Sequence, residues 1–94
     1  MRAVLLLKER RVLDERRFAE IVIWRVPASV AGRRHGFKYR LALVVDGVCV
    51  LRFDNEAGKG DHKHQDGREV PYGFTSMPRL VEDFWQAVED WKPR

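Results

Sequence analysis

Residues Phe37–Phe53, FKYRLALVVDGVCVLRF, contain the clearest structural signal in the sequence. Two runs rich in β-branched and aromatic residues flank the pair Asp46-Gly47. This pair is favoured at the two central positions of a tight type I′ turn, and the flanking runs are typical of β-strands. The segment therefore predicts a β-hairpin.

The two faces of this hairpin differ in character. In its first arm, five apolar side chains alternate with Lys38 and Arg40, which fall on the opposite face. In its second arm, Cys49, Leu51 and Phe53 are expected on one face, and Val50, Arg52 and Asp54 on the opposite face. Charged residues should therefore line one face near the open end of the hairpin.

The C-terminal segment predicts an amphipathic helix. Thr75 or Ser76 can serve as its N-cap, Met77-Pro78 suits the first turn, and Lys92-Pro93 ends it. Apolar residues recur at three- and four-residue steps and form one stripe, made of Leu80, Val81, Phe84, Trp85, Val88 and Trp91. We expect the stripe to pack on one face of an antiparallel sheet, which gives a two-layer α+β fold.

The N-terminal third adds further strands. Ala3–Leu7 is a short apolar run, followed by a charged turn at Lys8–Arg11 and a returning strand that begins at Val12-Leu13. Phe18–Val26 predicts a longer strand that Pro27 ends. With the hairpin, we expect an antiparallel sheet of four to five strands.

Length and composition bound the class of protein. The 94 residues, of which 45% are hydrophobic and 34% charged, suit one globular domain spanning residues 1–94. No apolar run is long enough to span a bilayer and the N-terminus becomes charged too early for a signal peptide, so we expect a cytoplasmic protein without membrane contact. The single cysteine, Cys49, lies in an apolar strand pattern and is expected to be a buried core residue.

The positive charge is concentrated in the first two thirds of the chain. Residues 1–64 carry 14 Lys/Arg against 8 Asp/Glu, whereas residues 65–94 carry 4 against 6, within a net charge of +4. Arginines predominate, and their planar guanidinium groups suit phosphates, so contact with nucleic acid is the leading interpretation. An acidic protein partner would satisfy the same charge.

The loop Gly58-Lys59-Gly60-Asp61-His62-Lys63-His64 carries the candidate chemistry. In an extended strand, His62 and His64 point the same way and lie roughly 7 Å apart, close enough to flank one phosphate. We predict that one neutral imidazole takes a proton from a ribose 2′-OH while the other, protonated, donates to the leaving 5′-oxygen. Lys59, Asp61, His62 and His64 are the predicted catalytic residues, with no metal or other cofactor, and the expected product is a 2′,3′-cyclic phosphate.

Two alternatives remain open for this loop. His62 and His64 with Asp61 or Asp54 could hold a divalent ion that activates water, although this ligand pattern has low specificity. Otherwise the loop only binds, with its lysines solvated and its acid in a turn.

Other residues support a phosphate-binding role. The predicted RNA- or phosphate-binding residues are Lys38, Arg40, Arg52, Lys63 and Tyr72. Tyr72 could stack on a base, but in the turn Pro-Tyr-Gly-Phe a packing role is the competing interpretation. His35, in a Gly-rich basic loop, is expected at the surface.

The combination of several segments carries a family resemblance. These are Phe37–Leu41 (FKYRL), Leu51–Glu56 (LRFDNE), Gly58–His64 (GKGDHKH) and Glu69–Phe74 (EVPYGF), followed by a short amphipathic helix. Together they resemble the TumE family of small toxins from bacterial and archaeal type II toxin-antitoxin modules, over nearly the whole chain. The usual family tyrosine at the RYDN position is Phe53 here, which argues against a catalytic hydroxyl at that site.

The resemblance implies a toxin neutralised by a helix-turn-helix antitoxin of the TumA kind. It suggests RNA cleavage, with free or ribosome-bound RNA as the target, because small basic toxins of such modules often cleave RNA. Binding of RNA or a ribosome without cleavage is the alternative. Whether the chain forms a homodimer through an edge strand is left open by the sequence.

Overall fold

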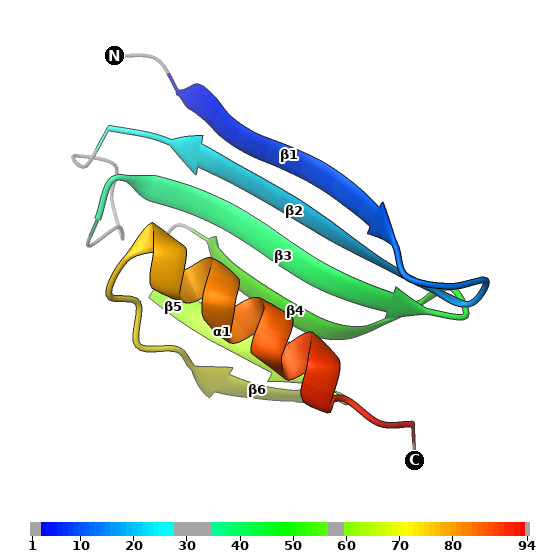
Figure 1. The fold of residues 1–94 in the computed structure, drawn as a ribbon. Helices are drawn as coiled ribbons and strands as arrows, with labels where there is room; N and C mark the ends of the chain where they lie inside the picture. Colours follow the sequence, from blue (N-terminus) through cyan, green and yellow to red (C-terminus); the bar gives the residue numbers. More distant parts are fainter. Residues whose placement is uncertain (1–2, 28–34, 57–59, 94) are drawn as a thin grey trace.

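The computed structural model of the protein describes residues 3–27, 35–56 and 60–93. These residues form an antiparallel sheet with the strand order β1-β2-β3-β4-β5-β6 and one C-terminal helix (Figure 1). The elements are β1 (Val4–Val12), β2 (Arg17–Arg25), β3 (Phe37–Val45), β4 (Val48–Glu56), β5 (Gly60–Gln65), β6 (Arg68–Pro71) and α1 (Met77–Asp90). The predicted α+β class is confirmed, with six strands instead of the four to five expected.

Two hairpins share the same turn chemistry. At the predicted turn between β3 and β4, Asp46 and Gly47 have φ angles of 51° and 78°, as a type I′ turn requires. The turn between β5 and β6 repeats this pattern at Asp66 and Gly67, with φ angles of 51° and 82°. The sequence prediction missed this second hairpin because β6 is only four residues long and its residues are exposed.

The first strand differs from the prediction. Lys8–Arg11 is not a turn but lies in the second half of β1, which pairs with β2 along its length. The chain turns instead after Val12, where the Asp14 carboxylate accepts hydrogen bonds from the backbone N–H groups of Arg16 and Arg17, each at 2.9 Å. Charged side chains are tolerated in β1 because it is an edge strand.

A register shift changes the environment of Cys49. Leu43 pairs with Leu51 while Val44 pairs with Cys49, so Val50 is an extra residue in β4. The bulge moves Cys49 off the core face, and its side chain is exposed, so the prediction of a buried cysteine is wrong.

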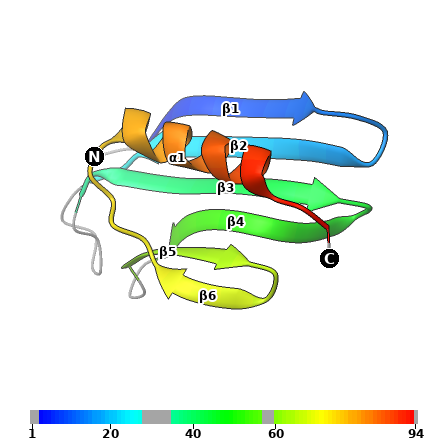
Figure 2. The same ribbon diagram turned by 60° about the horizontal axis from the view of Figure 1, so that its bottom comes forward.

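The helix covers one face of the sheet (Figures 1 and 2). Ser76 is its N-cap and accepts a hydrogen bond from the backbone N–H of Arg79 at 3.2 Å, and the helix ends before Lys92-Pro93, as predicted. Its apolar stripe closes a core whose fully buried side chains include Ile21, Ile23, Leu41, Leu43, Leu51, Phe53, Leu80 and Phe84.

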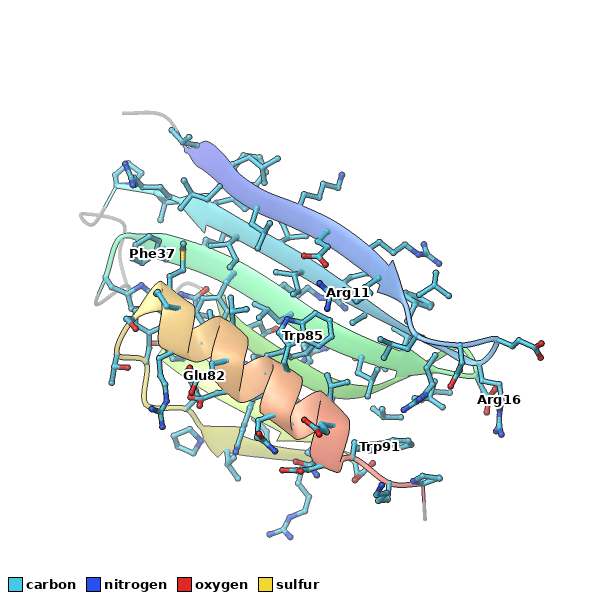
Figure 3. All side chains as sticks on the ribbon, in the orientation of Figure 1. Arg11, Arg16, Phe37, Glu82, Trp85 and Trp91 are labelled. Carbon is cyan, nitrogen blue, oxygen red and sulfur yellow. The ribbon has the colours of Figure 1, made fainter. Side chains whose placement is uncertain are left out.

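Two contacts fasten the helix beyond this core. Trp85 lies against β1, where the Arg11 guanidinium is 4.4 Å from the centroid of the Trp85 ring (Figure 3). At the other end, the indole N–H of Trp91 donates to Asp66 Oδ1 at 3.1 Å, which ties the helix terminus to the β5–β6 turn.

The opposite side of the sheet is not covered by α1, and we call it the open face. Because side chains alternate along a strand, residues next to the core residues Tyr39, Leu41 and Phe53 belong to the open face. Cross-strand pairing continues that assignment from strand to strand. The open face carries Lys38, Arg40, Arg52, Asp54, His62, His64 and Glu69.

Candidate functional site

Five polar side chains meet on the open face where β4, β5 and β6 lie side by side. Arg52 pairs with His64, Asp54 pairs with His62, and His64 pairs in turn with Glu69. Partners in an antiparallel ladder present their side chains on the same face, so the register alone brings the five together. We call Arg52, Asp54, His62, His64 and Glu69 the histidine cluster.

His62 is buried and fixed on both sides of its ring. Its Nδ1 lies 3.1 Å from the carbonyl oxygen of Gly60, and its Nε2 lies 2.7 Å from Asp54 Oδ1. Only 7% of the His62 side chain is exposed. Both neighbours are oxygen acceptors, but the Nε2–Oδ1 pair lacks hydrogen-bond geometry.

His64 has the opposite hydrogen-bonding role. Arg52 Nη2 lies 2.9 Å from His64 Nε2, and a guanidinium group can only donate, so this ring nitrogen is the acceptor. The His64 side chain is 27% exposed, more than that of His62. The two rings meet edge to face with centroids 5.2 Å apart, close enough to act on one phosphate.

The acids of the histidine cluster differ in exposure. Asp54 is 9% exposed and its Oδ2 lies 3.0 Å from Arg52 Nε. Glu69 is 46% exposed and its two carboxylate oxygens lie 3.5 Å from His62 Nε2 and 3.4 Å from His64 Nε2. Glu69, Asp61, His62, Val70 and Pro71 also line a surface hollow of about 290 Å³, which gives His62 a route to solvent.

Asp54 lies at ion-pair distance from His62 and Arg52, but these contacts have poor hydrogen-bond geometry. Asp54 Oδ1 and Arg52 Nε are buried atoms without a hydrogen-bond partner in the described part of the chain, although both lie at ion-pair distance from a neighbour. The N–H directions of His62 and Arg52 are therefore not aligned with the carboxylate. Unsatisfied buried polar atoms are rare and costly, and a bound water or ion is one way to satisfy them.

Asp61 does not join the histidine cluster. It pairs with Asn55 on the face that α1 covers, whereas its neighbour His62 belongs to the open face. Asp61 Oδ1 accepts from the Tyr39 hydroxyl at 2.7 Å and contacts His35 Nε2 at 2.9 Å. Burial, and then the hydrogen bond to Asp61, raise the pKa of the Tyr39 hydroxyl. This network fastens the ends of β3 and β5 together.

His35 is a packing residue of that second network. Its ring stacks on Phe74 with a centroid distance of 3.8 Å, and its Nδ1 accepts from the backbone N–H of Phe37 at 3.2 Å. Its side chain is 16% exposed, so His35 is partly buried and lies deeper than the surface position expected from the sequence. Because its Nδ1 is an acceptor, Nε2 carries the hydrogen that is donated to Asp61.

The other predicted site residues divide between the two faces. Lys38 and Arg40 lie on the open face beside the histidine cluster, and Arg40 pairs with Asp54. Lys63 lies on the other face, with its Nζ 5.9 Å from the centroid of the Phe53 ring. Lys59 lies outside the described residues.

Tyr72 has a packing position. Its ring meets Phe53 edge to face at 5.2 Å and its hydroxyl donates to Asp83 Oδ2 at 2.6 Å. Burial, followed by the hydrogen bond to Asp83, raises the pKa of this hydroxyl. Tyr72 thus joins the segment after β6 to the helix, and its predicted contact with RNA stays a prediction.

Comparison with protein-family models matches residues 2–92 to the family described as Toxin TumE. The chain belongs to the TumE family. No significant match was found among curated proteins or among solved structures. Family membership supports a toxin role and suggests an antitoxin as partner. In the described residues of this TumE toxin, no helix is long and apolar enough to cross a membrane.

The sequence analysis did not predict Glu69 as a member of the histidine cluster, and it gave Asp54 no role beyond that of a metal ligand. Glu69 lies across from His64 only because the Asp66-Gly67 turn sets the register of β5 and β6. That dipeptide was the available signal, since it repeats the turn pair of the central hairpin. Asp54 was considered only as a metal ligand, although it contacts both His62 and Arg52.

Proposed function

We propose that this TumE toxin is an endoribonuclease that cleaves RNA without a metal, using His62 and His64. One observation carries the proposal: two adjacent imidazoles, 5.2 Å apart, lie beside Arg52 on the sheet face that also carries Lys38 and Arg40. Proton transfer near neutrality needs imidazole groups, and a phosphodiester backbone needs cations along its path.

The contacts of the two rings support different roles for them in the proposed mechanism. His64 Nε2, an acceptor in the free protein, takes the proton of the ribose 2′-OH as the 2′-oxygen attacks phosphorus. His62, whose Nδ1 lies 3.1 Å from the Gly60 carbonyl oxygen and whose Nε2 lies 2.7 Å from Asp54 Oδ1, carries the proton that is delivered to the 5′-oxygen as its bond to phosphorus breaks. The products are a 2′,3′-cyclic phosphate and a 5′-hydroxyl end, and the two rings regain their starting states by exchanging protons with water.

Arg52 stabilises the charge that develops on the phosphoryl oxygens. In the free protein its guanidinium contacts Asp54 and His64, and its side chain is 31% exposed, so it can turn toward a bound phosphate. Releasing His64 Nε2 from Arg52 frees the base at the moment the phosphate arrives. Lys38 and Arg40 hold the adjoining backbone phosphates on the open face.

Incubation of the purified protein with a defined single-stranded RNA, with and without EDTA, tests this proposal. We expect cleavage that survives EDTA and leaves 2′,3′-cyclic phosphate ends, and H64Q should lower the rate by about 100-fold or more. R68Q is the matched control, because Arg68 lies in the same hairpin but pairs with Gln65 on the other face. Full activity of H64Q, or cleavage that needs a metal, would contradict the mechanism.

Binding without cleavage is the second candidate function. The cations Lys38, Arg40 and Arg52 on the open face favour it independently of the imidazoles. In that case charge reversal by R40E should abolish toxicity while H64Q stays toxic. If H64Q alone loses toxicity and R40E only weakens RNA affinity in a salt-dependent way, cleavage is the function.

The proposed biological setting follows from the family. A helix-turn-helix antitoxin of the TumA kind is the expected partner, and the expected place of action is the cytoplasm, on free or ribosome-bound RNA. The outer edge of β1, where Val4 and Leu5 are exposed, is available for pairing with a second copy. Sedimentation of the toxin alone tests the homodimer, and co-purification with the neighbouring gene product tests the antitoxin.

A further inference from the structure

The histidine cluster also has the donor set of a transition-metal site. Asp54, His62 and His64 each offer one ligand atom, and these atoms lie within 4.8 Å of one another. Two imidazoles and a carboxylate suit Zn²⁺ and similar divalent ions, and three protein ligands leave a coordination position open. Glu69, 3.4 and 3.5 Å from the two imidazoles, is placed to supply a fourth oxygen.

The orientation of His62 supports this assignment. Its Nδ1 faces the Gly60 carbonyl at 3.1 Å, which fixes the ring and directs Nε2 toward Asp54 and His64. Metal-binding histidines almost always donate their second ring N–H to such a carbonyl or to a carboxylate. When Nδ1 donates in this way, neutral His62 presents a lone pair at Nε2.

Asp54 supplies the second, independent observation. Its side chain is 9% exposed, and Oδ1 lies 2.7 Å from His62 Nε2 without hydrogen-bond geometry. Ligands of a common ion are close to each other but aim at the ion rather than at each other, and tetrahedral ligands lie roughly 3.4 Å apart. Only the missing alignment of this pair fits two atoms that face an ion, and an ion bound by both would have to move them apart from 2.7 Å to the ligand spacing.

In the free protein, the Arg52 guanidinium contacts the same side chains that would bind a metal ion. Its Nε lies 3.0 Å from Asp54 Oδ2 and its Nη2 lies 2.9 Å from His64 Nε2. A divalent ion and the guanidinium cannot both hold these atoms, because like charges at such distances repel strongly. Since 31% of the Arg52 side chain is exposed, it can withdraw into solvent.

We propose that Asp54, His62 and His64 bind a divalent transition-metal ion in competition with Arg52, and that the bound ion inhibits the toxin. The inhibition rests on the proposed function, because a bound ion occupies the imidazole nitrogens that would transfer protons. The metal site itself rests only on the geometry of the side chains.

Titration of chelator-treated protein with Co²⁺ and Zn²⁺ tests the site directly, by the visible absorption of bound Co²⁺ and by calorimetry. We expect one ion per chain, binding weakened at least tenfold in H64Q and D54N, and binding strengthened about tenfold or more in R52M. R68Q should bind like the wild type. Absence of binding, or equal affinity in wild type, H64Q and R52M, would overturn the site. H64Q also guards against misfolding, because His64 is the more exposed of the two histidines.

Cleavage assays with added Zn²⁺ separate the two proposals. Inhibition of wild type at the concentration that fills the site supports the inference. Metal binding in a protein that cleaves no RNA under any condition would leave the site standing and overturn the proposed nuclease. Cleavage that rises with Zn²⁺ would overturn the inhibitory role and make the ion part of the reaction.

Discussion

Replacement of Arg52 by methionine is the most informative perturbation of the histidine cluster. Methionine keeps much of the length of the side chain and removes the charge. Asp54, with 9% of its side chain exposed, then has His62 as its remaining ion-pair partner among the described residues. Breaking a buried ion pair costs roughly 3–5 kcal/mol, and the partial exposure of Arg52 reduces that to about 2 kcal/mol. For a chain of this size the melting temperature should fall by about 8–16 °C.

Thermal and urea unfolding of R52M in the presence of a chelator measure this loss. R40M is the matched control, because Arg40 pairs with Asp54 on the same face but is exposed. Its free energy of unfolding should stay within about 0.5 kcal/mol of wild type. An R52M variant as stable as R40M would refute the view that Arg52 compensates the buried carboxylate.

Adding Zn²⁺ to R52M extends the same experiment to the metal site. At a free concentration 100 times the dissociation constant, a ligand that binds only the folded state adds about 2.7 kcal/mol, enough to restore the stability that was lost. At the same Zn²⁺ concentration, wild type should gain less, because Arg52 competes for the ligands. Equal gains in both proteins would refute the competition.

Two further predictions concern the fold. F84A should destabilise the protein by roughly 3–5 kcal/mol in urea unfolding, because Phe84 is fully buried and packs edge to face on Phe53 at 5.9 Å. V12A, at a position that is 69% exposed, should change the stability little. Similar losses in the two variants would contradict the proposed core. The hydrogen bonds from Arg16 lower the pKa of Asp46 below 3.8, so this pair contributes stability that is present above about pH 3.8 and is lost as pH falls through the lowered value. R16M should raise the Asp46 pKa toward 3.8 in an NMR titration and flatten the acid end of the stability curve, and an unchanged pKa would contradict the pairing.

The predictable parts of this fold are those with strong local determinants. Asp46-Gly47 dictates a type I′ turn by its backbone preferences, and the helix carries its own cap, its apolar stripe and its stop. The positions of Cys49 and Glu69 depend instead on strand register. For Cys49, a bulge shifts the register by one residue. For Glu69, the strand β6 is too short and too exposed to give a clear sequence pattern. The pairings of β5 with β4 and of β6 with β5 were therefore beyond what the sequence patterns could predict.

The candidate site shows the same division. Alternation along an extended strand was enough to place His62 and His64 on one face, and the same rule separates both from Asp61. The contacts of Asp54 and Arg52 with the two rings required the pairing of β4 with β5, which brings together residues 8 and 12 positions apart. Strand periodicity therefore predicts which residues share a face, while only the register shows which of them touch.

Arg52 connects the proposed reaction with the proposed metal site. In the free protein it is the cation that Asp54 Oδ2 and His64 Nε2 share, so any second cation must displace it and any phosphate must draw it away. A phosphate that takes Arg52 leaves His64 free to accept a proton, whereas an ion that expels Arg52 occupies that same nitrogen. If both proposals hold, this one side chain makes RNA and metal mutually exclusive at the histidine cluster, and R52M should weaken RNA cleavage while it strengthens metal binding. A purely structural ion pair would not give these opposite changes in RNA cleavage and metal binding from a single substitution, and neither would a metal-dependent nuclease.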